Sequence, residues 1–308
     1  MVWRTAQRLH AALAGRRLTA CELRWPSLST ADLTGRPVIE VVSAGKHLLL
    51  RCGPVPGDDG VPRPVPGGDG VPLTLHSHLR MEGSWQVFRT DRPWHPPRPA
   101  HEVRAVLANP EWTAVGHRLG MLDLIPTAQE PRLIGHLGPD LLGGGWDAEE
   151  AVRRLAAHPD RPVGEALLDQ RVLAGVGTFY MCEVLFLRGV TPWTPVAQAG
   201  DLHRLVDLVH RIVLANRDRG VQSTTGDLRP GREQWVHARS ARPCRRCGTS
   251  IRVAPIGQPP IDRAAFYCPN CQRGPAPTDH GRPQQPLGAR RPSPGLRGQP
   301  LGTRRRSG

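Results

Sequence analysis

The chain has 308 residues, which is enough for two domains with smaller appendages. It carries 41 Lys and Arg against 27 Asp and Glu, and the resulting net charge of +14 favours a polyanionic partner, either nucleic acid or an anionic membrane surface. The charged residues Arg4, Arg8 and His10 argue against a secretory signal, and no apolar run approaches the ~18 residues of a membrane span, so we expect a soluble, cytoplasmic protein.

The first predicted element is a helix over residues 3–14. Trp3, Ala6 and Leu13 fall on one face of this helix, and Gly15 stands where it should end. No Ser, Thr, Asp or Asn precedes the helix to accept hydrogen bonds from its first amides, which suggests a chain whose beginning is missing.

Lys46 is the only lysine in the sequence, since the other 40 basic residues are Arg. Arg serves phosphate contacts and ion pairs at least as well as Lys, but it keeps its proton and cannot act as an amine nucleophile. Lys46 is therefore a candidate amine catalyst. Chance retention of a lysine on a strand is the alternative that the residue type alone leaves open.

Short strands with the spacing of a β-sandwich or barrel surround this lysine. Apolar and polar residues alternate within 73–79, as in a half-buried strand. Residues 54–72 hold a nine-residue Pro, Gly and Asp unit written nearly twice, which predicts a flexible hairpin insertion. Strands are predicted around 18–25, 38–43, 46–52, 73–79, 83–89, 102–108 and 113–125.

A glycine-rich linker at 138–146 opens a predicted helical half. Gly175 and Gly177 lie in a turn between two of its helices, where glycine permits a sharp bend and lets backbone amides approach an anion. Simple packing of a helix pair is the alternative. The helices are predicted near 147–157, 163–169, 178–188 and 200–219.

Two Cys-x-x-Cys pairs follow the helices, separated by twenty residues. Four thiolates in this spacing complete a closed tetrahedral shell, which suits one structural Zn²⁺ and leaves no position for catalysis. Two disulfides or free thiols are the alternatives. Arg245, Arg246, Arg252 and Arg263 lie on this predicted hairpin and suggest a grip for phosphate. The predicted ligands are Cys244, Cys247, Cys268 and Cys271.

Beyond the cysteine pairs, residues 273–308 are rich in Arg, Pro and Gly and poor in apolar groups. This composition predicts a disordered cationic tail with a loose, salt-sensitive attraction to nucleic acid. The remaining cysteines, Cys21, Cys52 and Cys182, stand in apolar surroundings and are predicted to be reduced core residues.

Several motifs occur together in a fixed order, and in this combination the chain resembles the formamidopyrimidine-DNA glycosylase / endonuclease VIII family from residue 2 to about 272. The details are most similar to actinobacterial endonuclease VIII-like members. The motifs are Gly-Lys-His-Leu-Leu at 45–49, His-Leu-Arg-Met-Glu-Gly-Ser at 78–84, Leu-Gly-Pro-Asp at 137–140, Gly-Val-Gly at 175–177 and Arg-Ala-Ala-Phe-Tyr-Cys at 263–268.

The resemblance implies an α+β multidomain fold. Its parts would be a two-layer β-sandwich catalytic domain with a flanking helix, a helix–two-turn–helix DNA-binding domain, a zinc-finger hairpin and the disordered basic tail. The implied bounds are 1–137 for the sandwich, 138–146 for the linker, 147–240 for the helical domain, 241–272 for the finger and 273–308 for the tail.

The resemblance also implies a function: excision of oxidised bases, pyrimidines foremost, from double-stranded DNA, followed by nicking of the strand. The damaged nucleotide would be flipped out, and an amine would attack the sugar C1′ to form an imine whose C2′ proton is acidic. The enzyme would act as a monomer at the nucleoid, on oxidised-base or abasic-site DNA and without a membrane partner.

Site roles carry over position by position. Lys46 would lie beside the flipped sugar, Met81 would wedge into the duplex with Arg80 alongside, and Arg263 would clamp phosphates. Gly175, Gly177 and Thr178 would hold the DNA backbone. Most members carry Asn where Thr178 stands, so that contact is expected to be weaker here.

The family begins with Pro-Glu-Gly-Asp-Thr, whose proline amine is its nucleophile, whereas here Met1 is followed directly by Val2. Two interpretations follow: a start site assigned too late, or a truncated, non-catalytic binder of damaged or abasic DNA on the same fold. An RNA-binding zinc-ribbon protein is a third interpretation, but it leaves Lys46 and the glycine turn unexplained.

Overall fold

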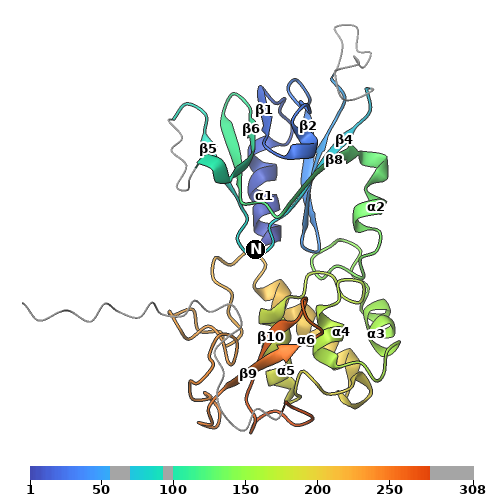
Figure 1. The fold of residues 1–308 in the computed structure, drawn as a ribbon, viewed down its shortest axis with the longest axis vertical. Coiled ribbons are helices and arrows are strands. Elements are labelled where there is room, and N and C mark those ends of the chain that lie inside the picture. The colour runs from blue at the N-terminus through green and yellow to red at the C-terminus, as the bar shows by residue number, and fades with distance from the viewer. Residues whose placement is uncertain (56–69, 93–99, 278–308) are drawn as a thin grey trace, which may run out of the picture.

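The computed structural model describes residues 1–55, 70–92 and 100–277. The chain folds into two lobes stacked along the long axis, and its first residue lies at the waist between them (Figure 1). Most of the predicted insertion at 54–72 and of the predicted tail at 273–308 lies outside the described residues, so those two expectations stay predictions.

The upper lobe is a two-layer sandwich of antiparallel sheets. One sheet has the strand order β1-β6-β7-β5 and the other has the order β2-β3-β4-β8. The strands are β1 (Ala20–Leu23), β2 (Val38–Ala44), β3 (His47–Cys52), β4 (Leu73–His78), β5 (Ser84–Arg89), β6 (Val103–Ala108), β7 (Trp112–His117) and β8 (Met121–Pro126).

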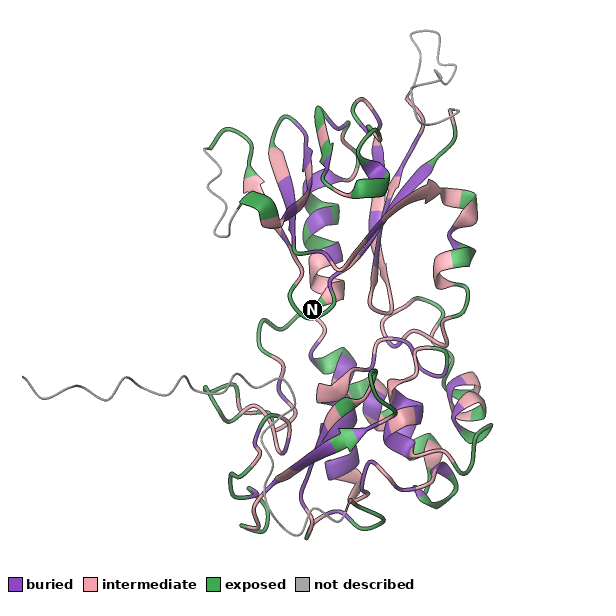
Figure 2. Ribbon diagram, viewed as in Figure 1, coloured by how far each residue is buried: buried purple, intermediate pink, exposed green. Residues whose placement is uncertain are grey.

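Alternating apolar residues explain why these strands pair in two layers. Leu48, Leu50 and Leu75 are buried between the sheets, because side chains two apart share one face of a strand. Helix α1 (Val2–Leu13) closes one side of the sandwich and buries Leu9 and Leu13 against it. Figure 2 shows burial concentrated on the sheet faces and the helix side that look into this lobe.

The single strand predicted over 113–125 is wrong: the segment forms two strands in different sheets. Between β7 and β8, Arg118 adopts φ +46° and the Gly120 N–H donates to the His78 carbonyl at 2.9 Å. The apolar pattern continues through this bend because the chain crosses from one buried layer directly into the other.

The lower lobe combines helices with a two-stranded hairpin, as the sequence predicts. Its core includes Phe186 and Val209 from the helices together with Val253 and Phe266 from the hairpin, so helices and hairpin share one core. A short helix, α2 (Pro131–Ile134), precedes the connection between the lobes. The other elements are α3 (Ala148–Ala156), α4 (Val163–Leu168), α5 (Thr178–Arg188), α6 (Leu202–Ala215), β9 (Arg252–Ile256) and β10 (Arg263–Tyr267).

A buried carboxylate anchors α5 to the loop that leads into the hairpin. Glu183 is fully buried and accepts hydrogen bonds from the backbone N–H groups of Trp235, Val236 and His237, each at 2.8 Å. The hydroxyl of Thr224 donates to the same carboxylate. These donors offset the cost of burying the charge.

No helix in the described parts of the chain combines the length and the apolar character that a membrane span requires.

Candidate functional site

Lys46 lies in the tight turn between β2 and β3, at the end of the sheet that faces the lower lobe. The turn needs Gly45, which adopts φ +56°, and a Cβ there would lie 3.2 Å from the Cβ of Ala174. The Gly45 N–H donates to the Asp140 carboxylate at 2.8 Å. Asp140 therefore joins the lysine turn of the upper lobe to the connection between the lobes.

The Lys46 amine is in an environment that favours its neutral form. Burial, and then the nearby positive charge of Arg263, lower the pKa of Lys46 from 10.5 to about 8. At pH 7.5 about a quarter of such an amine is unprotonated, against about one part in a thousand at the ordinary pKa. A larger share of this amine is therefore neutral near pH 7.5 than in an exposed lysine.

The glycine turn between α4 and α5 comes directly against this amine. The Lys46 Nζ lies 3.7 Å from where a Cβ on Gly177 would be, which is an ordinary van der Waals distance. Gly175 adopts φ +104°, and its N–H donates to the Gln170 side chain at 3.0 Å. Thr178 begins α5 directly after the turn. Lys46, Gly175, Gly177 and Thr178 thus meet at the waist between the lobes.

Arg80 and Met81 form an exposed tip between β4 and β5. Arg80 adopts φ +51°, and its N–H donates to the Nδ1 of His78 at 3.0 Å. The Met81 side chain is 97% exposed, which is unusual for a large apolar group. Burial, followed by the charges of Lys46, His76 and Arg80, lowers the pKa of His78.

Arg263 begins β10, and its positive charge, after burial, lowers the pKa of Lys46. The predicted phosphate grip of four arginines stays a prediction, and two of its members have contacts within the protein. Arg245 donates to the carbonyls of Gly231 and Gln234, and Arg246 stacks on the Phe186 ring at 4.5 Å. Arg245 thus ties the hairpin to the loop that precedes it, and Arg246 ties it to α5.

The four predicted cysteine ligands come together in one cluster. Their sulfur atoms all lie within 4.8 Å of one another, with Cys244 and Cys271 at 3.9 Å and Cys247 and Cys268 at 3.5 Å. These separations are too long for disulfides, which need about 2.05 Å. They match the S···S edge of about 3.8 Å that a tetrahedral shell with Zn–S bonds of ~2.3 Å requires. The cysteines are free, and the cluster is a possible metal site.

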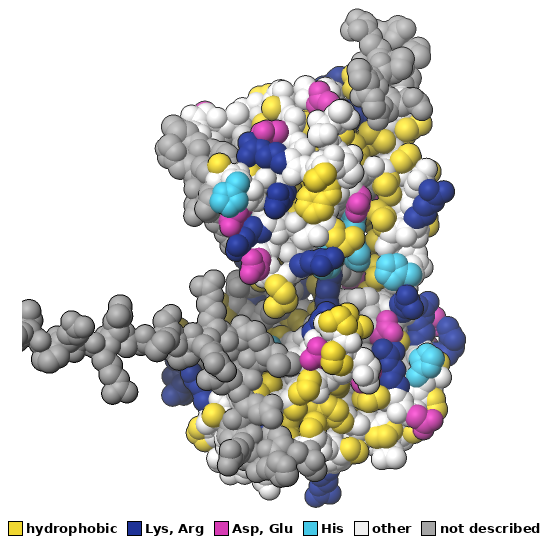
Figure 3. Space-filling model, in the orientation of Figure 1, with side chains coloured by type: hydrophobic (Ala, Val, Ile, Leu, Met, Phe, Trp, Pro, Cys, Tyr) yellow, Lys and Arg dark blue, Asp and Glu magenta, His cyan; other side chains and the backbone are white. Residues whose placement is uncertain are grey.

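A histidine cluster beside Lys46 was not predicted from the sequence. His47 Nδ1 lies 2.8 Å from His76 Nε2, and His76 Nδ1 lies 2.9 Å from the Asp123 carboxylate. The rings of His78 and His136 lie 5.2 and 6.3 Å from the His47 ring. In Figure 3, histidine side chains lie at the waist next to Lys and Arg side chains. The alternation of His76 and His78 along their strand was the available signal.

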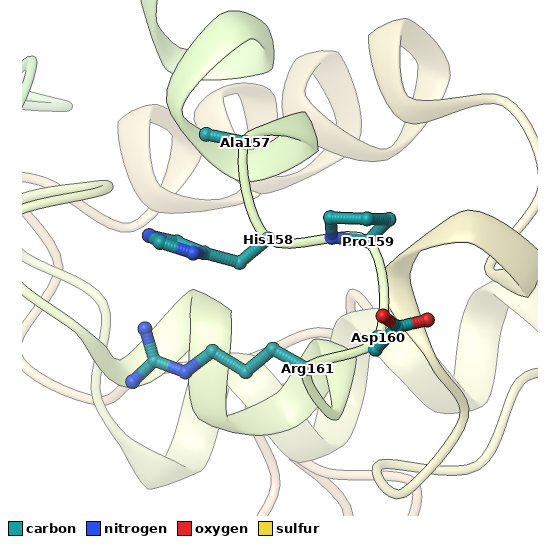
Figure 4. Close-up of a pocket in the computed structure, with 5 residues that line it drawn as sticks. All are labelled: Ala157, His158, Pro159, Asp160 and Arg161. Carbon is teal, nitrogen blue, oxygen red and sulfur yellow. The ribbon is translucent and has the colours of Figure 1, made fainter.

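A hollow of about 420 Å³ lies in the lower lobe at the loop 157–161. Figure 4 shows His158 and Arg161 extending next to each other along it. Arg161 donates to the Asp169 carboxylate at 2.9 Å, so its charge is already paired. The hollow is lined by residues other than the predicted site residues.

Comparison with known proteins gives this geometry its context. Residues 2–121 match the family described as Formamidopyrimidine-DNA glycosylase N-terminal domain. The chain is 51% identical over 283 residues to "Probable endonuclease 8 2" of Streptomyces coelicolor, covering 91% of this chain and 95% of that protein. It is 40% identical over 271 residues to "DNA-(apurinic or apyrimidinic site) lyase Nei2" of Mycolicibacterium smegmatis, covering 88% and 96%.

Among solved structures, the fold matches Lactococcus lactis Fpg in complex with DNA containing an abasic site. The TM-score is 0.68 at 23% identity, over 89% of this chain and 98% of that one. The fold of this chain is therefore that of Lactococcus lactis Fpg. The chain belongs to the formamidopyrimidine-DNA glycosylase / endonuclease VIII family, and the relatives named above are endonuclease 8 and Nei2 proteins.

Proposed function

We propose that this chain is a DNA glycosylase with abasic-site lyase activity, which excises oxidised bases, pyrimidines foremost, from double-stranded DNA and then nicks the strand. One observation carries the proposal. The only lysine, with its pKa lowered to about 8, meets the Gly177 turn and the charge of Arg263 where the two lobes join. An amine so placed is suited to attack a sugar carbon held between the lobes.

In the proposed reaction the damaged nucleotide is flipped out of the duplex, at a cost of a few kcal/mol that is smaller at a damaged pair. An amine attacks C1′ of the sugar and the base leaves, which gives an imine. The imine acidifies the C2′ proton, and loss of that proton expels the 3′ phosphate. Lys46 is the catalytic residue proposed here, as the amine that reacts with abasic sugars.

The remaining site residues are proposed to hold the DNA. The exposed Met81 fills the gap left by the flipped nucleotide, with Arg80 beside it on the same tip. Arg263 binds phosphate next to the lesion. Gly175, Gly177 and Thr178 present the backbone and hydroxyl of the helix–turn–helix to the strand.

The cysteine cluster is proposed to hold one structural Zn²⁺. Two knuckle hydrogen bonds support this, from the Arg246 N–H to Cys244 Sγ and from the Cys271 N–H to Cys268 Sγ, each at 3.4 Å. Such bonds stabilise thiolates, the form that binds a metal. A bound Zn²⁺ would supply rigidity to the hairpin that carries Arg263, while the chemistry stays with the amine.

The domain division proposed is 1–137 for the catalytic sandwich, 147–240 for the helical DNA-binding domain and 241–272 for the zinc finger. The two separate cores, one reaching from Ala6 to Leu122 and the other from Leu141 to Cys268, support a division near the linker. We propose a monomer acting on DNA at the nucleoid.

Borohydride trapping tests the proposal, because it reduces an imine between protein and sugar to a stable bond. The chain is mixed with abasic and oxidised-pyrimidine duplexes, in parallel with a version extended by Pro-Glu-Gly-Asp. We expect a covalent adduct on both duplexes from the extended version, and on the abasic duplex from the chain itself. Lys46→Arg should remove the second adduct, whereas Arg8→Gln, on the outer face of α1, should keep it.

Absence of any adduct from either version would overturn the enzymatic proposal and leave a non-catalytic binder of damaged DNA. An equal preference for single-stranded RNA in competition would instead support the RNA-binding interpretation.

A further inference from the structure

The outer face of the sheet β2-β3-β4-β8 carries a line of hydrogen-bonded titratable side chains that ends beside Lys46. His47 and His78 are paired across β3 and β4, and His76 is paired with Asp123 across β4 and β8. Side chains at these register positions share one face of the sheet. Asp123, His76 and His47 therefore form one continuous chain across three strands, with links of 2.9 and 2.8 Å.

The direction of hydrogen-bond donation along this line of side chains follows from the carboxylate of Asp123 at its end. A carboxylate only accepts hydrogen bonds, so His76 donates its Nδ1–H to Asp123 and keeps a lone pair on Nε2. His47 then donates its Nδ1–H to His76. The Nε2 of His47 is left with a lone pair that can accept a proton.

The His76 side chain is completely buried, whereas the Asp123 side chain is 41% exposed. Burial holds the His76 ring in place, and the exposed Asp123 carboxylate connects the hydrogen-bonded line of side chains to solvent. A proton taken up at His47 can therefore be passed outward through His76 to Asp123. Two imidazole nitrogens at 2.8 Å are spaced for a hydrogen bond rather than for sharing a metal ion, which indicates proton transfer.

We propose that His47 is the residue that accepts the C2′ proton in the strand-cleaving step, and that His76 and Asp123 are positioning residues that set its tautomer. The C2′–H bond breaks and its electron pair forms a C1′–C2′ double bond, while the imine electrons move to nitrogen. The nitrogen lone pair then re-forms the double bond to C1′, and the C1′–C2′ electron pair moves to form a C2′–C3′ double bond. The C3′–O bond breaks in the same step, and the phosphate leaves with the electrons of that bond. His47 holds the proton as an imidazolium until a proton is passed on through His76 to Asp123.

The electrostatic surroundings keep the His47 imidazole neutral before DNA binds. Burial, followed by the charges of His76, His78, His136 and Lys46, lowers the pKa of His47 to about 4. His76 and His78 face it from β4, His136 from the segment after α2, and Lys46 from its own turn. A DNA phosphate would raise this pKa, so in the complex His47 becomes a stronger base while still starting neutral.

This inference rests on the proposed lyase activity, so the test separates the imine from the elimination that follows it. Wild-type protein and His47→Gln are compared on a preformed abasic duplex in single turnover, with trapped adduct and nicked strand measured separately. We expect the adduct to form normally and nicking to slow about 100-fold or more, the usual contribution of a positioned base. The acid limb should disappear from the pH profile of the nicking rate per adduct, a rate that excludes the titration of Lys46 during adduct formation.

Asp123→Asn provides a second variant at an exposed position, where folding is not at risk. It should slow nicking, by less than His47→Gln, and move the acid limb, while the adduct yield stays unchanged. His101→Gln, on the surface of the upper lobe, is the matched control and should behave as wild type.

Equal nicking rates in wild type and His47→Gln would overturn the inference and leave the proposed function standing. So would a parallel loss of adduct and nicking, which would indicate a merely structural role. A wild-type protein that forms no adduct would overturn both.

Discussion

The lowered pKa of Lys46 can be measured directly, because the chain contains no other lysine. Lysine labelled with ¹³C at the ε position gives one NMR signal, whose shift follows the protonation of this amine alone. We expect the titration midpoint in the free protein at about 8. An exposed lysine would titrate near 10.4.

Arg263→Gln tests the cause of the shift. Burial is the larger of the two causes and the Arg263 charge the smaller, so removing the charge should recover less than half of the drop from 10.5 to about 8. The midpoint should therefore rise by about one pH unit or less. Arg8→Gln keeps the local charge of the site and should leave the midpoint in place.

The sign of the effect on activity follows from the same titration. The neutral amine is the reactive form, so trapping on abasic DNA should increase with pH through the midpoint and level off above it. A wild-type midpoint at or above 10 would refute the burial of the amine, and an unchanged midpoint in Arg263→Gln would refute the contact between the two residues.

Three further predictions concern the supports of the site. Asp140→Ala leaves the N–H groups of Gly45 and Leu142 without their acceptor and should cost about 1–3 kcal/mol in chemical denaturation, whereas Asp140→Asn, which keeps an acceptor oxygen, should cost less. Glu183→Ala leaves several buried backbone N–H groups without an acceptor and should lower the free energy of unfolding by about 3–5 kcal/mol. A decrease below about 1 kcal/mol would contradict the hydrogen-bond network described. Removal of the metal with a strong chelator should lower the melting temperature and release one Zn²⁺ per chain, measured by a colorimetric dye, while a chain without bound metal as purified would refute the proposed ligand set.

Much of the fold was predictable because its signals are local. Alternation located the strands around Leu75, the 3.6-residue period located the helices, and the cysteine spacing located the metal-type cluster. The error at 113–125 arose because an apolar pattern does not reveal a change of sheet. The bend is stabilised by a hydrogen bond from Gly120 to His78, a contact across 42 positions that local patterns do not contain.

The site was predictable in its members but only partly in its arrangement. Lys46 was identified by its rarity in the sequence, which says nothing of the Arg263 charge that reaches it from the far end of the chain. The chain from Asp123 to His47 depends on the register of three strands, and each histidine alone resembles an ordinary polar residue on a sheet. The position of Arg246 over the Phe186 ring is likewise a contact between distant parts of the sequence, which local patterns do not contain.

Helix α5 is connected to two parts of the site, the glycine turn and strand β10. It begins directly after Gly177, which lies next to Lys46, and one turn into the helix the Cys182 sulfur accepts a hydrogen bond from the Phe266 N–H of β10 at 3.2 Å. Eleven residues of helix make a stiff rod of about 16 Å. The glycine turn and β10, which starts with Arg263, are therefore both attached to α5. Any rigid-body motion of the lower lobe relative to Lys46 would move the two together.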